Sequence, residues 1–192
     1  MRDLQETMLG EKSIGLTAAA RGLRNLLDGA IGALPFEETL TDLGETAPRN
    51  ETSVITVLKL GDQRVMLTGD AGRRALTRAA IEYEHVIGSF RSHPLSIFQG
   101  PHHGSRRNIG PTLLVRILGP RHGGWGQNAI VSAAEAAPKH PSAKVTNALA
   151  RRGCYVLATR GMTINYRLNM ASRPGWSTVP ALPPLFEGDD DA

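Results

Sequence analysis

The chain has 192 residues, of which 41% are hydrophobic and 21% charged, and it carries a net charge of +4. This length and balance are typical of one globular domain and exclude a largely disordered chain. No run of about 18 apolar residues is present and the N-terminus lacks the layout of a signal peptide, so we expect a cytoplasmic protein without membrane contact.

Residues 1–48 differ in pattern from the rest of the chain. Leu and Ala recur at helical spacing over residues 17–34, which predicts one helix, and an acidic, turn-rich stretch without period follows. We therefore separate an N-terminal segment, 1–48, from a main domain, 49–170. The remaining residues, 171–192, form a Pro-rich, acidic tail that we expect to drape over the surface or fray.

From residue 52 onward the hydrophobic pattern predicts regular elements. Two β-branched stretches, 52–60 and 64–70, flank Gly61-Asp62 and predict a hairpin. The later elements alternate between helices and buried strands and end in a second hairpin; in chain order they are expected over residues 73–90, 95–100, 110–120, 128–134, 142–152 and 154–168. Pro111 suits a first helical turn, Ser142 an N-cap and Gly153 a helix stop.

This order of elements predicts an α/β layered fold, with a mixed β-sheet and helices packed on it. The single cysteine, Cys154, rules out an internal disulfide and a cysteine-based zinc cluster. It precedes an apolar stretch, where we expect a small buried residue rather than a nucleophile.

Residues with metal-binding or catalytic chemistry follow three of the predicted strands. They are Asp70, the pair His102-His103, and Lys139-His140. Ligands of α/β sheets gather outside the carboxyl ends of the strands, so we expect these residues in one neighbourhood. Asp70 has two readings: an N-cap of the following helix, or a metal ligand.

The adjacent histidines have no packing reason on an exposed turn, whereas imidazole is a leading ligand for zinc, iron and manganese. In an extended dipeptide the two side chains point to opposite sides, so one could ligate while the other orients it or touches substrate. His140 precedes Pro141 and a helix N-terminus, a setting that predicts contact with a phosphate or carboxylate or a plain surface residue.

Basic residues occur in pairs, and a basic face suits an anionic partner such as a phosphodiester. The alternative is an ordinary solvated surface. The pairs are Arg73-Arg74, Arg106-Arg107 and Arg151-Arg152.

Four stretches carry a resemblance to a known family: NETSVITVLKLGDQRVMLTGDAG, PHHGSRRNIGPTLL, NAIVSAA and KHPSAKVTNALARRGCYVLATRG. They resemble the C-terminal half of the metallo-β-lactamase-fold hydrolases, in the subgroup related to the ComEC-type DNA-uptake proteins. The match runs from about Asn50 to Arg167, and its specific part is TGD followed by PHHGS in this order and spacing.

The resemblance implies that the chain forms half of an αββα sandwich, with one or two divalent metal ions, usually zinc, at the edge between the halves. The family's metal-ligand aspartate maps onto Asp70, and its last metal-ligand histidine onto the His102-His103 pair, where we favour His103. The resemblance makes His140 an active-site residue, which together with His102 we assign a catalytic role. As substrate-binding residues we assign Ser105, Arg106, Arg107 and Lys139. The implied reaction is hydrolysis of an ester or phosphodiester bond.

One departure from the family limits this prediction. The principal metal motif, His-x-His-x-Asp-His, is absent, and the first histidine is His85. We therefore expect a truncated or split hydrolase, inactive as an isolated chain, that needs a complementary N-terminal half or a homodimer. The alternative is a non-catalytic nucleic-acid-binding or scaffold protein that retains the half-fold and binds through a basic strip; this strip comprises Arg106, Arg107, Arg151 and Arg152.

Overall fold

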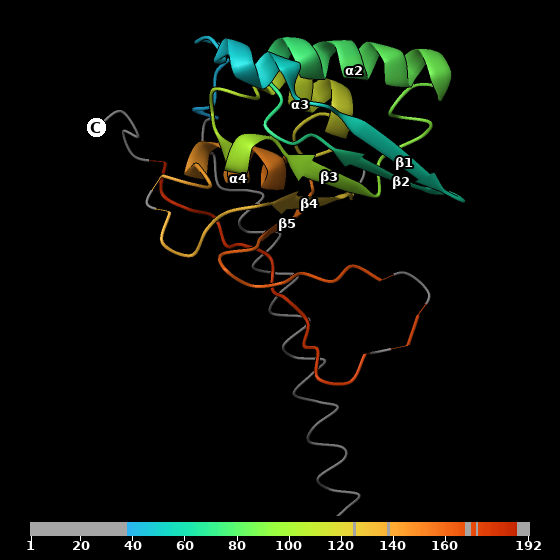
Figure 1. The fold of residues 1–192 in the computed structure, drawn as a ribbon, viewed down its shortest axis with the longest axis vertical. Coiled ribbons are helices and arrows are strands. Elements are labelled where there is room, and N and C mark those ends of the chain that lie inside the picture. The colour runs from blue at the N-terminus through green and yellow to red at the C-terminus, as the bar shows by residue number, and fades with distance from the viewer. Residues whose placement is uncertain (1–37, 125, 138, 168–169, 172, 188–192) are drawn as a thin grey trace, which may run out of the picture. The chain divides into compact units, whose positions relative to one another are not determined.

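The computed structural model describes residues 38–124, 126–137, 139–167, 170–171 and 173–187 (Figure 1). The helix predicted over residues 17–34 lies outside these residues. From Glu38 onward the chain forms one compact unit. Within the described residues, no helix has both the length and the apolar character needed to cross a membrane.

The described helices and strands follow the predicted order. The strands are β1 (Thr56–Leu60), β2 (Gln63–Leu67), β3 (Ile97–Gly100), β4 (Asn128–Val131) and β5 (Tyr155–Ala158). The helices are α2 (Arg73–Val86), α3 (Pro111–Leu118) and α4 (Ala143–Arg151), and the short 3-10 turns are η1 (Pro48–Thr52) and η2 (His102–Gly104).

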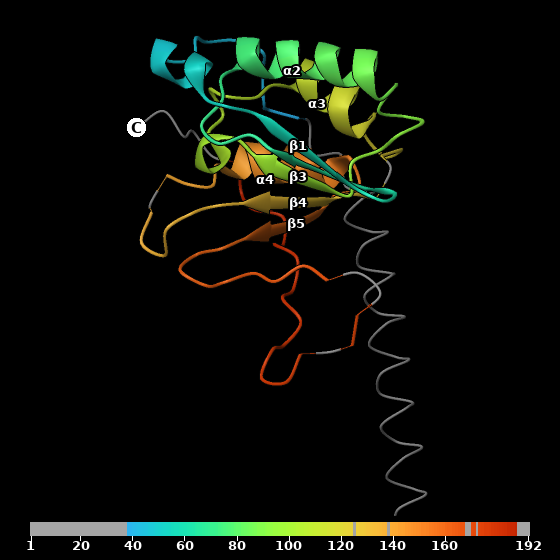
Figure 2. The ribbon, with the colours of Figure 1, turned by 45° about the vertical axis from the view of Figure 1, so that its right-hand side comes forward.

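The five strands form one mixed sheet in the order β1-β2-β3-β4-β5. β1 and β2 are the predicted antiparallel hairpin, whereas β2 to β5 run parallel. Successive right-handed crossovers in one direction place their helices on the same face. Accordingly α2 contacts α3 and α3 contacts α4, and Figures 1 and 2 show α2 and α3 side by side over the sheet. The predicted α/β layered class is confirmed.

The hydrophobic core lies between the three helices and this face of the sheet. Met66 and Phe98 point into it from β2 and β3, and both are completely buried, as is Leu114 of α3. The opposite face is open at the β1–β2 end, where Leu58 and Leu67 are 43% and 40% exposed. On β3 and β5, however, its residues Ile97 and Leu157 are buried. Strand residues alternate between the faces, so one register explains both observations.

The end signals of the helices are also confirmed. Pro111 occupies the first turn of α3, Ser142 stands at the N-cap of α4, and Gly153 follows α4 with a φ of +76°. Cys154 is buried, 8% exposed, as expected. Burial raises the pKa of its thiol to about 12, which keeps it protonated and unreactive at neutral pH.

The predicted second strand of the closing hairpin is wrong. Residues 159–167 contain no strand. The chain turns at Arg160 and Gly161, and the C-terminal tail takes the place beside β5: Leu182 N donates to Val156 O at 2.8 Å. The tail is further tied by Leu185 N, which donates to Asn147 Oδ1 at 2.9 Å. Its described part thus drapes over the unit, as one of the two expectations had it.

Candidate functional site

The carboxyl ends of the parallel strands bring the predicted site residues to one edge of the sheet. Asp70 lies in the turn after β2, the histidine pair in the turn after β3, and His140 in the segment after β4. A backbone hydrogen bond joins the first two turns: His102 N donates to Gly69 O at 2.9 Å.

Three imidazoles meet at this edge. The ring centroids of His102 and His103 are 5.7 Å apart, and each lies 6.2 Å from that of His140. We call these three residues the imidazole cluster. Sequence reasoning placed all three at the edge but not their rings against one another.

The expectation of an extended His102-His103 dipeptide is wrong. Both residues are left-handed, with φ of 44° and 57°, and Gly104 continues at +75°. A Cβ on Gly104 would lie 2.8 Å from Cβ of Pro141, so this position needs glycine on two counts. The tight turn directs both imidazoles toward the same neighbourhood instead of to opposite sides.

Left-handed backbone costs an L-residue about 1–2 kcal/mol, and two consecutive histidines in it are therefore held by their surroundings. Within the turn, Gly104 N donates to Pro101 O at 2.9 Å and Ser105 N donates to His102 O at 3.0 Å. From outside, Ser142 N donates to Gly104 O at 3.2 Å, which links the turn to the start of α4.

The ring of His103 is oriented by a backbone carbonyl. Its Nδ1 lies 2.7 Å from Ser132 O, at the end of β4. A carbonyl only accepts hydrogen bonds, so Nδ1 carries the proton and neutral His103 presents the lone pair of Nε2. This is the arrangement that orients metal-binding histidines in many proteins.

The ring of His102 is held by two asparagines. Asn108 Nδ2 donates to Asp70 O and Ala71 O, both at 3.1 Å, so its Oδ1 faces Nδ1 of His102 at 3.0 Å. Asn50 Nδ2 lies 3.0 Å from the same nitrogen and can donate to it only when Nδ1 has no proton. The fixed orientation of Asn108 favours the Nδ1–H form.

His140 differs electrostatically from the other two. Burial, and then the proximity of His102 and His103, lowers its pKa below the ordinary value, so the ring is neutral at neutral pH. Its Nδ1 is buried and has no hydrogen-bond partner among the described residues. The His140-Pro141 peptide bond is cis. His140 therefore has one nitrogen shielded from water and no charge of its own.

Asp70 is not the N-cap of α2, so that reading is wrong. The N-cap is Gly72, and the first-turn amide of Ala75 donates to Oε2 of Glu51 at 2.8 Å. Glu51 extends from η1 to the N-terminus of α2 and accepts the hydrogen bond that the N-cap reading expected Asp70 to accept. The Asp70 side chain is exposed in the turn after β2 and does not cap α2.

The donor types at this edge suit a zinc ion, but their arrangement does not complete a site. Within the described ranges, no group of three or more His, Cys, Asp or Glu side chains is placed to hold a metal ion. A catalytic zinc site needs three protein ligands and an open position. The donor types therefore fit a zinc ion, but the number of ligands falls short of a complete site.

The predicted substrate-binding residues divide into two kinds. Arg106, Arg107 and Lys139 are partly or fully exposed. Ser105 is buried, 8% exposed, and its Oγ accepts a hydrogen bond from Arg107 N at 3.3 Å. Its hydroxyl supports the turn that carries the two arginines.

The predicted basic strip is wrong in its second half. Arg151 pairs with Glu187 at 2.6 Å, and Arg152 pairs with Glu38 at 2.5 Å, with side chains 13% and 1% exposed. Both arginines lie at the C-terminal end of α4, where Glu187 of the tail and Glu38 reach them and form ion pairs. Only Arg106 and Arg107 of that strip remain on the surface.

Sequence reasoning missed the residues that orient the imidazoles. Asn50, Asn108 and the Ser132 carbonyl lie in three separate segments, and no motif joins them. The run from His102 to Asn108 gave one usable signal, because an asparagine six residues after a histidine can return to it across a tight turn.

No protein-family model matches the chain, and no curated protein or solved structure shows significant similarity to it.

Proposed function

We propose that the chain contributes part of the active site of a metal-dependent hydrolase of the metallo-β-lactamase type, which cleaves an ester or phosphodiester bond. The observation that carries the proposal is the imidazole cluster at the carboxyl edge of the sheet. Two of its members occupy strained backbone, and neither packs in the hydrophobic core. Such strain persists at functional sites.

In this proposal Asp70 and His103 are ligands of one or two zinc ions. A bound zinc would polarise the scissile bond and supply a nucleophile at neutral pH. The chain's own residues prepare for it: the Ser132 carbonyl fixes Nε2 of His103 as the free nitrogen. Neutral His140 accepts a proton, and His102 contacts the substrate beside it.

Two ligands are fewer than a catalytic zinc site needs, so the proposal includes a partner. A complementary N-terminal half or a second copy of this chain would add the remaining ligands. The β1–β2 end of the sheet supports this, since exposed Leu58, Leu60 and Leu67 offer an apolar surface there that another layer could cover. We propose a cytoplasmic location for this assembly.

The second candidate is a non-catalytic protein that binds nucleic acid or acts as a scaffold. Arg106 and Arg107, next to the imidazole cluster, favour it. The ion pairs of Arg151 and Arg152 reduce the basic surface on which it was based. It predicts salt-sensitive DNA binding that needs no metal.

Zinc binding and hydrolysis, measured on the same preparations, test the proposal. Zinc affinity is determined by calorimetry for the wild type, Asp70→Asn, His103→Gln and the matched control His122→Gln; hydrolysis of bis(p-nitrophenyl) phosphate is followed with added zinc. We expect weak zinc binding that the first two variants abolish and the control keeps, with turnover only after a complementary chain is added. Zinc binding that is indifferent to His103→Gln would refute the site.

A further inference from the structure

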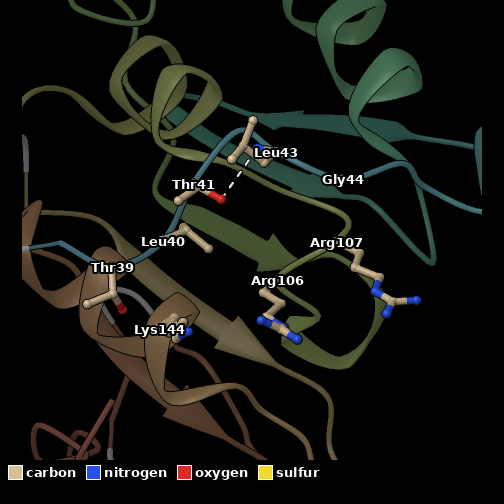
Figure 3. Close-up of a pocket in the computed structure, with 8 residues that line it drawn as sticks. All are labelled: Thr39, Leu40, Thr41, Leu43, Gly44, Arg106, Arg107 and Lys144. Atoms are coloured by element: carbon tan, nitrogen blue, oxygen red, sulfur yellow. Dashed lines mark hydrogen bonds between the residues drawn. The ribbon is translucent and has the colours of Figure 1, made fainter. Parts of the chain in front are cut away.

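A basic pocket is lined in part by Arg106 and Arg107, which follow His102 and His103 along the chain. It has a volume of about 360 Å³ and opens between residues 39–44, the turn at 106–107 and the start of α4 (Figure 3). Its lining includes Thr41 and Gly44 of the first segment, Arg106 and Arg107 of the turn, and Lys144 of α4.

The lining carries three cations and no carboxylate. Arg106 and Arg107 leave the same turn, and Lys144 stands at the beginning of α4 (Figure 3). The acidic neighbours are engaged elsewhere. The carboxylate of Asp42 accepts a hydrogen bond from Thr112 Oγ1 at 2.6 Å, and that of Glu187 pairs with Arg151 while also accepting from Thr39. The three cationic side chains of the lining outnumber these two neighbouring carboxylates.

Arg73 joins two of the segments that line the pocket. Its guanidinium donates to three carbonyls of the 39–44 segment: Asp42 O at 2.5 Å, and Gly44 O and Thr41 O, both at 3.2 Å. It also donates to Arg106 O, in the turn at 106–107, at 3.0 Å. The neighbouring Asp42 carboxylate offsets the charge of this guanidinium, so Arg73 preorganises the site rather than adding to its net charge.

We infer that this pocket binds a phosphate group, as a phosphomonoester or as one phosphodiester unit of a strand. Arginine forks and lysine ammonium groups are the side chains that recognise phosphate oxygens. The volume lies at the small end of the range for ligand pockets, which suits one compact anionic group. The inference that the pocket binds an anion depends only on the residues around it, and not on the proposed hydrolase function.

If the proposed function holds, the position of the pocket suits it to holding the substrate of the hydrolase. Arg106 stands three positions after His103, so their Cα atoms are at most about 11 Å apart. A ligand held by its phosphate at Arg106 and Lys144 would extend toward the imidazole cluster. The pocket would then anchor an anionic substrate beside the bond to be cleaved.

The test measures anion binding without metal. Backbone amide NMR and calorimetry, in EDTA, follow titration with inorganic phosphate, with a short oligodeoxynucleotide bearing or lacking a 5′-phosphate, and with its uncharged methylphosphonate analogue. We expect shifts at Thr41, Gly44 and Arg107, and no binding of the uncharged analogue. A need for the 5′-phosphate assigns a phosphomonoester, and equal binding of both charged strands assigns a phosphodiester.

Three variants locate the binding. Arg106→Gln and Lys144→Gln should each weaken it by about tenfold, the effect of one charge-assisted hydrogen bond. The matched control, Arg91→Gln, replaces an exposed arginine outside the pocket and should change affinity by less than about twofold. Equal weakening by all three variants, or shifts that miss the pocket, would overturn the inference.

A fourth variant separates this inference from the proposed function. His103→Gln should leave phosphate binding unchanged while it removes zinc binding. If the wild type binds zinc but does not bind phosphate, the phosphate pocket is refuted and the metal site is not. The converse result refutes the metal site and leaves the pocket standing.

Discussion

The two edges of the parallel strands use left-handed backbone differently. At the amino edge Gly61 in the hairpin bend and Gly153 after α4 adopt it, and the exposed His122 adopts it singly. At the carboxyl edge two consecutive histidines, His102 and His103, adopt it, and hydrogen bonds to both rings hold them there. Strain borne by two adjacent residues whose rings are held in place marks the edge where side-chain chemistry is needed.

The amino edge should dominate stability, and Arg152→Met tests this most strongly. Arg152 is buried and pairs with Glu38, whose side chain is only 9% exposed. Removing the guanidinium leaves a buried carboxylate unpaired, so we expect a loss of about 3–5 kcal/mol in urea unfolding. Zinc and phosphate binding of the folded fraction should not change. A loss below about 1 kcal/mol would contradict the structural role of this pair.

Asn108→Ala should have the next largest effect, because Asn108 joins the turns after β2 and β3. Its side chain is 1% exposed and bonds two carbonyls and the His102 ring. We expect about 2–3 kcal/mol of destabilisation in urea unfolding, together with weaker zinc binding. Asn165→Ala, at an exposed position, is the control and should change stability by under about 0.5 kcal/mol. Unchanged zinc binding in Asn108→Ala would mean that the position of Asp70 does not depend on the hydrogen bond from Asn108 to its carbonyl.

Glycine substitutions compare the strain at the two edges directly. His122, exposed at the amino edge, has a φ of 59°, close to the 57° of His103. His122→Gly should gain up to about 1 kcal/mol in thermal unfolding, since glycine removes the left-handed cost but adds freedom to the unfolded chain. His103→Gly should gain less, because it also loses the bond to Ser132 O. An equal gain at both positions would show that this bond contributes nothing.

The smallest expected effect is on the titration of His140. Burial, and then His102 and His103, lowers its pKa in the folded protein, whereas the unfolded value is about 6.5. Its neutral form therefore supports folding above that value, and the contribution is lost as pH falls below about 6.5. NMR of the His140 ring should show its pKa below the ordinary histidine value. His102→Gln with His103→Gln should raise its pKa only in part, because burial remains; no change would exclude the coupling.

Much of the fold could be predicted from the sequence because each element carries its own local signal. The period-2 stretches around Gly61, the Pro111 start and the Gly153 stop all act within a few residues and were confirmed. The second closing strand failed because its edge position was taken by Leu182, some 20 residues further along, and no local pattern reports such competition.

The site was predictable only to the level of neighbourhood. Topology brings the carboxyl ends of parallel strands together, so Asp70 and the histidines could be placed at one edge. The backbone of His102 and His103 could not, because left-handed histidine is stabilised by contacts from Gly69, Asn108 and Ser132. The burial of Arg152 was missed for the same reason: its partner, Glu38, is distant in sequence.

The most direct test of a real but incomplete metal site at this edge is long-range ¹⁵N NMR of the histidine rings, recorded on the isolated chain during a zinc titration. We expect His103 in the Nδ1–H form and a shift of its Nε2 that saturates only at high micromolar to millimolar zinc. A His103 Nε2 that does not respond, or full saturation at stoichiometric zinc, would contradict this expectation.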